Sequence, residues 1–376
     1  MTHPLAVLEA LCRRGEASRA ELAEETGLSP ATISRAVAYL RGQGLAFESS
    51  EAGQGVGRPP RVVKLRSDAA HVVGIDAGGS RIRVVLTDLD GNPRARGTQT
   101  VRLGTRIDVF ARAIAGLVRD VAAQSAGRLV AAGAGISGIV DAAKGMVLLS
   151  PDLPVLSGKA VASCLSDELG LPVAIDNDDL LAAAGEVAFG AAQGCTDVAF
   201  LSFGHGLGAG LIVGGRPVRG ARSSAGAVAY LAPDALGDRA SGRAIARRYL
   251  ALRGIRGGRT TAERVFELAS DGDPVAHEVV EDARRALGDI VVDVAAMIDP
   301  EVIVLGGGLV RGQSALLHAL RQRLRHDLPF PPALVTSALG EDAVARGAAG
   351  LALTLAQRRL AGEPAEPGTL GSLRFV

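Results

Sequence analysis

Two glycine-rich segments, each adjoining apolar runs, limit the fold of this chain more than any other feature. The first is 76–80, between the apolar runs 72–75 and 82–87, and the second is 204–210, which follows the run 198–202. An apolar run, a glycine turn and a returning run together predict a β-hairpin. Two such hairpins can face each other and present backbone N–H groups to a polyphosphate held between them. The sequence therefore predicts a duplicated architecture, with one hairpin in each of two lobes.

The segments around the hairpins predict that both lobes are α/β. Apolar residues recur at helical spacing over 107–121 and 280–297, and short apolar runs predict strands at 129–134, 172–175 and 302–305. A closing helix that starts near Glu341 and a tail rich in Pro, Gly and Glu complete the chain. We therefore expect an N-terminal domain over 1–66, a first lobe over 70–185, a second lobe over 186–360 and a tail over 361–376.

The N-terminal domain carries the start and stop signals of three short helices. Leucines three residues apart mark a first helix that ends at Gly15, and Ser18 can cap a second helix over 19–26. Ser29 can cap a third helix, with Pro30 at the first helical position, where its missing N–H does no harm. A tight glycine turn between the second and third helices is the geometry of a helix-turn-helix.

The outer face of the third helix carries short polar and cationic side chains that suit the major groove of DNA. Strands at 45–47 and 62–65 follow, and the polar, Gly-rich loop 48–61 between them predicts a wing that reaches the minor groove. We expect Thr32 and Arg35 to touch bases or phosphates. The predicted DNA-binding residues are Ser29, Ala31, Thr32, Ser34, Arg35, Arg41 and Arg58. The alternative is a small helical interaction domain followed by a flexible linker.

Composition restricts how DNA could be bound and where the protein works. The chain has 376 residues, 48% of them apolar, and a net charge of +1, so DNA binding must come from a local module. No apolar run reaches about 18 residues and no basic region leads into an apolar core at the N-terminus, so we expect neither a membrane span nor a signal peptide. A cytoplasmic location is the default expectation. The three cysteines are far apart, which argues against a disulfide framework and a cysteine zinc site.

Six motifs in a fixed order make the chain resemble the ROK family, which groups bacterial sugar-responsive repressors with sugar kinases. The motifs lie at 75–80, 138–141, 150–154, 177–178, 204–210 and 299–308. The resemblance covers nearly the whole sequence and implies an actin-like ATPase fold for the two lobes. The expected fold class is α/β: an N-terminal winged helix-turn-helix followed by a two-lobed actin-like ATPase domain similar to the ROK sugar kinases.

The resemblance also implies roles for individual residues. Asp178 would take the proton from a sugar hydroxyl that attacks the γ-phosphoryl group, and Asn177 would bind a ring hydroxyl. Asp76 would act near metal-bound phosphates, and the glycine run 306–308, with Gly307, would contact adenine. The structural alternatives are helix or turn caps for the three polar residues and close helix–strand packing for the glycine. The implied ligand-binding residues are Asn177, Asp178, Ser137, Gly138 and Tyr230, and the implied phosphate-binding residues are Asp76, Gly78, Gly79, Ser80, Gly204, Gly206, Gly208 and Gly307.

After the second hairpin the chain departs from the family pattern. Ala227 stands where a sugar-binding glutamate is expected, Tyr230 where a histidine should serve both sugar and zinc, and 231–239 where a cysteine cluster should bind zinc. Zinc needs about four N or S ligands in tetrahedral reach, so we expect no metal. His205 replaces a small hydroxyl residue, and packing or solvent exposure is a better interpretation of it than a chemical role. We expect weak binding of ordinary hexoses and no resident cofactor.

These features predict a DNA-binding transcription regulator, a repressor of carbohydrate-related genes, whose kinase-like domain senses a saccharide and does not phosphorylate it. Opening and closing of the lobes would change the spacing of two DNA-binding domains in a homodimer, which implies a palindromic double-stranded operator. A tetramer is also open. One alternative is a sugar kinase that uses ATP and Asp178 and carries an appended DNA-binding domain. Another is a regulator that is controlled by a partner protein docking on the lobes.

Overall fold

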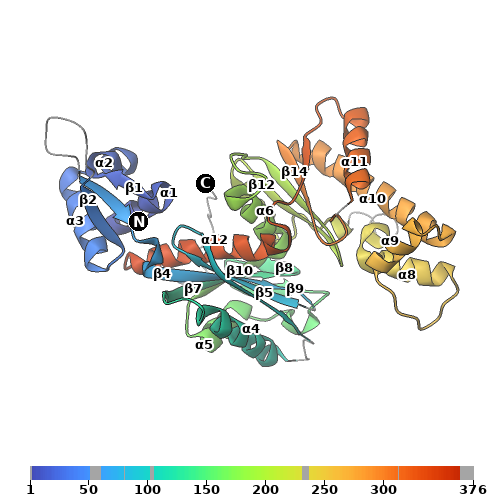
Figure 1. Cartoon of the computed structure of the whole chain (residues 1–376), viewed down its shortest axis with the longest axis horizontal. Coiled ribbons are helices and arrows are strands. Elements are labelled where there is room, and N and C mark those ends of the chain that lie inside the picture. Colours follow the sequence, from blue (N-terminus) through green and yellow to red (C-terminus); the bar gives the residue numbers. More distant parts are fainter. Residues whose placement is uncertain are drawn as a thin grey trace. The chain divides into compact units, whose positions relative to one another are not determined.

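The computed structural model describes residues 2–50, 61–79, 81–101, 106–230, 237–311 and 313–364 (Figure 1). The described residues divide into two compact units: the first runs up to Asp176 and resumes at Ala348, and the second spans Asn177–Gly347. Helix α12 (Ala343–Leu360) begins in the second unit and continues into the first. None of the described helices is long and apolar enough to cross a membrane.

The first unit opens with a helix-turn-helix and a three-stranded sheet of order β1-β3-β2. We call residues 2–65 the reading head. Its elements are α1 (His3–Arg14), β1 (Glu16–Ser18), α2 (Arg19–Thr26), α3 (Pro30–Gly42), β2 (Ala46–Ser50) and β3 (Arg61–Leu65). Arg58, the predicted minor-groove residue, lies outside the described residues.

Local signals in the sequence define the helices of the reading head. The Ser18 hydroxyl accepts a hydrogen bond from the Glu21 N–H, and the Glu21 carboxylate accepts one from the Ser18 N–H, so both ends of this capping box are satisfied. The Ser29 hydroxyl caps α3 by accepting a hydrogen bond from the Thr32 N–H. The predicted bounds of α2 and the predicted start of α3 are confirmed. β1 was not predicted, because three residues are too few for an alternation pattern.

The rest of the first unit is built on a five-stranded sheet of order β10-β7-β4-β5-β6. α4 packs against α5, β5 and β6, and its buried face carries apolar residues such as Phe110 and Ile114. A small two-stranded sheet, β8-β9, adjoins this core. The elements are β4 (Ala70–Ala77), β5 (Arg81–Asp88), β6 (Pro93–Thr100), α4 (Ile107–Ala122), β7 (Arg128–Ile136), β8 (Ile139–Asp141), β9 (Met146–Leu149), α5 (Val161–Leu169) and β10 (Val173–Asn177).

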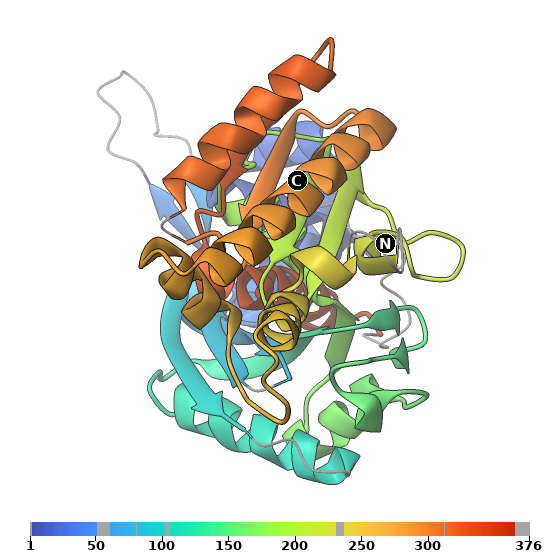
Figure 2. The same cartoon turned by 90° about the vertical axis from the view of Figure 1, so that its right-hand side faces the viewer.

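The second unit is built on a five-stranded sheet of order β13-β12-β11-β14-β15. Its core includes buried residues of α10 and α11, the long helices drawn in orange in Figure 2. The elements are α6 (Asp178–Phe189), β11 (Val198–Phe203), β12 (Leu207–Val213), β13 (Arg216–Pro217), α7 (Gly237–Ala240), α8 (Gly242–Leu252), α9 (Ala262–Ser270), α10 (Pro274–Ile298), β14 (Val302–Gly306), α11 (Ser314–Asp327) and β15 (Ala333–Thr336).

The two five-stranded sheets have the same internal topology. In each, the first three strands in sequence form an antiparallel meander, and the next large-sheet strand pairs in parallel with the first strand of that meander. The fifth strand lies at the edge beyond it. This repetition confirms the duplicated α/β design that the two glycine segments predicted.

Candidate DNA interface and effector site

Helix α3 buries one face and exposes the other. Ile33, Val37 and Leu40 are fully buried, so the side chains on the opposite face point to solvent. The exposed residues on α3 beyond its first position are Ala31, Ser34, Arg35, Ala38, Tyr39, Arg41 and Gly42. Arg35 makes no hydrogen bond or ion pair to any described residue, and it therefore has its guanidinium available for a ligand.

The other polar residues that are predicted to bind DNA at α3 and its N-cap already have partners within the reading head. The Ser29 hydroxyl accepts a hydrogen bond from the Thr32 N–H, and the two hydroxyl oxygens are 2.9 Å apart. Ser34 accepts a hydrogen bond of 2.7 Å from Arg19. Arg41 pairs with Glu48 at 2.9 Å. DNA binding by these residues stays a prediction, and for Ser29 the capping role is sufficient to explain its presence.

Glu48 lies at the centre of a group of arginines, which we call the Glu48 cluster: Arg19, Arg41, Glu48 and Arg61. The carboxylate is 2.7 Å from Arg19, 2.9 Å from Arg41 and 3.9 Å from Arg61, and its side chain is only 11% exposed. The hydrogen bond from Arg19 is the main reason why the pKa of Glu48 lies below its ordinary value; burial opposes it, and the charges of the three arginines add to it. Glu48 therefore stays ionised at neutral pH.

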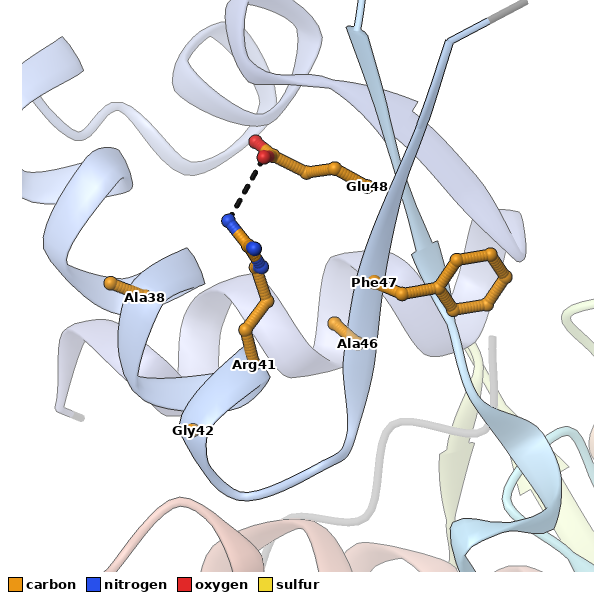
Figure 3. A pocket seen from close by; sticks show the side chains of 6 residues that line it. All are labelled: Ala38, Arg41, Gly42, Ala46, Phe47 and Glu48. Atoms are coloured by element: carbon orange, nitrogen blue, oxygen red, sulfur yellow. Dashed lines mark hydrogen bonds and ion pairs between the residues drawn. The ribbon is translucent and has the colours of Figure 1, made fainter.

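A hollow of about 540 Å³ lies beside the cluster, between the C-terminal half of α3 and β2 (Figure 3). Its lining combines three small residues and one aromatic side chain with one cation and one anion: Ala38, Arg41, Gly42, Ala46, Phe47 and Glu48. In Figure 3 the Arg41 and Glu48 side chains extend from α3 and β2 toward each other, with their ion pair dashed. The hollow is thus part of the reading head and not of the ROK-like lobes.

In the first unit, the candidate phosphate and ligand residues make several contacts within the fold. The carboxylate of Asp76, nearly buried at the end of β4, pairs with Arg83 of β5 at 3.1 Å. Ser137 accepts a 2.6 Å hydrogen bond at its carbonyl from the Ser150 hydroxyl. A Cβ at Gly138 would lie 2.3 Å from a backbone oxygen, so this position needs glycine for packing. Ser80 lies outside the described residues.

The glycines of the first hairpin are less constrained by packing. A Cβ at Gly79 would meet only Asp152, at 3.5 Å, and one at Gly78 would approach a backbone oxygen at 3.2 Å. Neither glycine has a positive φ. Packing therefore does not account for both glycines, and their predicted role in phosphate binding stays open.

The second hairpin differs from its prediction in where the glycine turn ends. Strand β12 begins at Leu207, so Gly208 and Gly210 lie in a strand and not in a turn. They are needed there because α6 packs closely on β12: a Cβ at Gly208 would lie 1.8 Å from a carboxylate oxygen of Asp179, and one at Gly210 would lie 2.0 Å from the Asp179 carbonyl oxygen. Close packing explains both glycines.

The turn of the second hairpin is held by the N-terminus of α8. The carbonyl oxygens of Gly204 and His205 accept hydrogen bonds from the N–H groups of Gly242 at 2.8 Å and Arg243 at 3.3 Å. These are first-turn N–H groups of the kind that often bind anions, and here the protein's own backbone takes them up. The His205 side chain is exposed, and a Cβ at Gly206 would meet nothing within 4 Å.

Gly307, the candidate adenine contact, has a packing role. Its φ is +94°, and a Cβ there would lie 2.3 Å from the Phe203 carbonyl oxygen. The neighbouring Gly308 has space for a Cβ and no positive φ. Close packing of the loop after β14 on β11 therefore accounts for Gly307 alone, without a nucleotide.

The candidate catalytic pair lies at the N-terminus of α6 and takes part in its capping. The Asn177 side-chain oxygen accepts a 2.9 Å hydrogen bond from the Leu180 N–H, and its amide donates to Asp178 at 3.0 Å. The same Asp178 oxygen accepts from the Asp179 N–H at 3.1 Å. The structural alternative considered for these residues is thus realised, although Asp178 remains only half-buried.

Sequence reasoning missed Asp179, whose carboxylate lies against Gly208. Burial raises the pKa of Asp179 from 3.8 to about 6, and a hydrogen bond with Ser202 opposes this increase. It also missed Arg19 and Glu48 in the reading head. An isolated glutamate in a short strand gives no signal on its own, and the partners of Glu48 come from three other elements.

The predicted absence of zinc stays a prediction. No group of three or more His, Cys, Asp or Glu residues could hold a metal within the part of the chain that is described. In the segment 231–239, which replaces the expected cysteine cluster, residues 231–236 lie outside that part, as does the side chain of Tyr230.

Comparison with known families identifies both parts of the chain. The profile of the ROK family matches residues 72–355, and that of the MarR family matches residues 3–55. This protein belongs to the ROK family, and its reading head is a MarR-type winged helix-turn-helix. The predicted fold, a winged helix-turn-helix followed by an actin-like ATPase domain, is confirmed.

Relatives of this chain include both an enzyme and a repressor. The bifunctional enzyme NanE/NanK of Brucella melitensis is 31% identical over 320 residues, which are 80% of this chain and 59% of that enzyme. This chain thus corresponds to less than two thirds of that relative. The xylose repressor of Bacillus subtilis is 24% identical over 364 residues, which are 92% of this chain and 94% of the repressor.

A solved structure extends the similarity of fold over nearly the whole molecule. A ROK family transcriptional regulator, a homologue of the Escherichia coli MLC protein, matches with a TM-score of 0.77 and 23% identity, covering 96% of each chain. The reading head and both lobes therefore occur in the same order in a protein of known structure.

Proposed function

We propose that this protein is a DNA-binding transcription regulator that represses carbohydrate-related genes, and that its ROK domain senses a saccharide without phosphorylating it. The observation that carries this proposal is the exposed face of α3. There, Arg35 lies among small residues such as Ala31 and Ala38, with no partner among the described residues. An arginine that is free on a recognition helix can bind O6 and N7 of guanine with two hydrogen bonds.

The contacts in the second unit favour a sensor over a kinase. The N–H groups at the N-terminus of α8 already bind the carbonyl oxygens of the glycine turn, and Asn177 caps α6. A kinase stabilises transferred phosphate mainly through free N–H groups, cations and metal ions aimed at it. With those N–H groups occupied, a largely uncharged saccharide is the better candidate ligand. Similarity to a xylose repressor over 92% of this chain also supports a saccharide effector.

Repression would be relieved through a change between lobe-open and lobe-closed states. A ligand that binds one state more tightly shifts the population toward it, and in a symmetric dimer this changes the spacing of the two reading heads. The operator should accordingly be palindromic, with half-sites about one helical turn or a multiple apart.

The proposal is tested by selecting DNA that the purified protein binds from fragments of the genome that encodes it. We expect enrichment of one palindromic sequence by the wild-type protein and its loss with Arg35→Ala. Arg325→Ala is the matched control, because Arg325 is an exposed arginine of α11 and its loss changes the net charge equally. The absence of any enriched sequence would refute the proposal, and equal enrichment by all three proteins would refute the role of Arg35.

A sugar kinase is the second candidate, because Asp178 remains at the start of α6 and NanE/NanK is 31% identical. A coupled assay with ATP, magnesium and a panel of hexoses separates the two functions. The regulator account predicts no turnover above background. Turnover that Asp178→Asn abolishes would establish the kinase instead.

A further inference from the structure

The Glu48 cluster places an internal anion against two arginines, one on α3, the proposed recognition helix, and one at the start of α2. Arg19, the first residue of α2, and Arg41, in the last turn of α3, bind opposite oxygens of the Glu48 carboxylate. Their side chains are 37% and 49% exposed, whereas that of Glu48 is 11% exposed. Solvent, or a ligand in its place, can therefore reach the cations more easily than the carboxylate that holds them.

The cluster extends along one flank of α3. Ser34 and Arg41 are seven residues apart, which puts them on the same side of a helix. Arg19 links Ser34 to Glu48, since one guanidinium nitrogen donates to the Ser34 hydroxyl at 2.7 Å and another to the carboxylate at 2.7 Å. The polar chain from Ser34 to Arg41 thus covers two turns of the helix on the side that faces β2.

The hollow beside the cluster has the chemistry of a site for one backbone phosphate of DNA. Ala38, Gly42 and Ala46 keep it open because their side chains are short, and Arg41 supplies a cation at its wall. The cluster holds three arginines against one glutamate, so its net charge favours an anion. A phosphate that enters must compete with Glu48 for the same guanidinium groups.

We propose that Glu48 acts as an internal competitor of DNA phosphate for Arg19 and Arg41, and so sets how weakly this protein binds DNA that lacks its operator. This inference rests on the proposed DNA-binding function. Affinity for non-target DNA depends on how many phosphates the protein neutralises. An arginine that is already neutralised contributes less to that affinity, whereas contacts to bases at an operator are unaffected. The consequence is a higher ratio of specific to non-specific binding.

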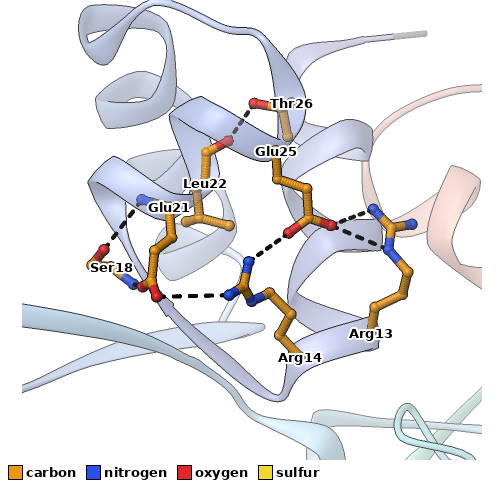
Figure 4. Close-up of polar contacts among 7 residues, drawn as sticks. All are labelled: Arg13, Arg14, Ser18, Glu21, Leu22, Glu25 and Thr26. Atoms are coloured by element: carbon orange, nitrogen blue, oxygen red, sulfur yellow. Dashed lines mark hydrogen bonds and ion pairs between the residues drawn. The ribbon is translucent and has the colours of Figure 1, made fainter.

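The chain contains a matched control for this proposal in a second carboxylate that holds two arginines. Glu25 of α2 pairs with Arg13 at 2.8 Å and with Arg14 at 3.1 Å (Figure 4). These arginines belong to the end of α1 and not to α3. Glu25→Gln and Glu48→Gln raise the net charge of the full-length protein equally, so only the position of the lost anion differs.

The test is the affinity of full-length wild-type, Glu48→Gln and Glu25→Gln proteins for a scrambled duplex and for the selected operator, between 50 and 200 mM salt. For Glu48→Gln we expect about 5–10-fold tighter binding to the scrambled duplex near 0.1 M salt and a salt slope steeper by about one, as for one additional phosphate contact. For Glu25→Gln we expect a change of less than about twofold, since its arginines lie outside the recognition helix. An unchanged or weakened affinity of Glu48→Gln for the scrambled duplex, or an equal gain with Glu25→Gln, would overturn the proposal.

Circular dichroism establishes whether Glu48→Gln keeps the wild-type fold. If it does not, Arg41→Gln replaces it, and the proposal predicts that this change weakens binding to the scrambled duplex by less than Arg35→Gln does. An equal or larger loss with Arg41→Gln would contradict it. Failure of the proposed function itself looks different, because the wild-type protein would then bind the selected and scrambled duplexes equally.

Discussion

The reading head and the second glycine hairpin use their polar groups in opposite ways. On α3, Arg35 is exposed and has no partner within the described structure, and Arg41 is half-exposed beside an open hollow. At the hairpin, the carbonyl oxygens of Gly204 and His205 are bound by α8, and Gly208 is pressed against α6. The first region is available to a ligand, whereas the second is largely occupied by its own fold. A glycine motif is therefore weak proof of a phosphate site, because packing can require the same glycines.

The largest expected effect comes from Gly307→Ala, which tests whether packing explains that glycine. The new Cβ would meet the Phe203 carbonyl oxygen at 2.3 Å, in a backbone conformation that L residues rarely adopt. We expect the free energy of unfolding to fall by about 3 kcal/mol, as strain and overpacking add. Gly308→Ala is the control, with a change within about 0.5 kcal/mol, because a Cβ there meets nothing. Denaturant unfolding measures both, and a harmless Gly307→Ala would reopen the nucleotide interpretation.

The next effect concerns the reading head. Arg35→Ala should weaken operator binding by about 1–3 kcal/mol, which is roughly tenfold to a hundredfold, and should relax the base preference at one position. Fluorescence anisotropy with the operator and its single-base variants measures this loss. An unchanged affinity would mean that α3 does not read DNA through Arg35, and the contrast between the two regions would fail.

A smaller effect, with a distinct pH dependence, is expected from Asp179 beneath the hairpin. Burial raises its pKa from 3.8 to about 6, so the folded protein favours the protonated form. The stability contributed by this group is complete below pH 3.8 and is lost as the pH rises through about 6. The free energy of unfolding of Asp179→Asn should therefore exceed that of the wild type by about 1–2 kcal/mol at pH 7.5 and differ little at pH 4. A difference in unfolding free energy that does not change with pH would contradict this assignment.

The smallest effect is expected from Ser29→Ala, which separates helix capping from DNA contact. Loss of the cap on α3 should cost about 1 kcal/mol of stability. At a low temperature, where the variant is fully folded, its affinity for the operator should change by less than about threefold. A tenfold loss of affinity by a fully folded variant would instead assign Ser29 a direct role at the DNA.

Local signals allowed most of the helices and strands to be predicted. The hydroxyls of Ser18 and Ser29 each accept a hydrogen bond from the N–H three residues later, so the sequence alone specifies the starts of α2 and α3. The duplicated sheet also followed from the alternation of apolar runs and glycines. Gly208 was wrongly predicted to lie in a turn. Glycine is required there because α6, which is distant in sequence, packs too closely for a side chain.

The candidate site was harder to predict because its chemistry depends on tertiary partners. Glu48 lies 29 positions from Arg19 and 13 positions from Arg61 along the chain. The raised pKa of Asp179 likewise depends on burial against β12. Neither residue type is unusual at its position, so only the fold reveals what each one contacts.

The most direct test of the account is the affinity of the full-length protein for its selected operator, measured with and without saccharides and with magnesium ATP. If the ROK domain senses a sugar, at least one saccharide should lower this affinity by about 5–150-fold, the usual range of coupling between two sites, while ATP should leave it unchanged. A response to ATP, or no response to any saccharide, would contradict the account of a DNA-binding protein that senses sugar without phosphorylating it.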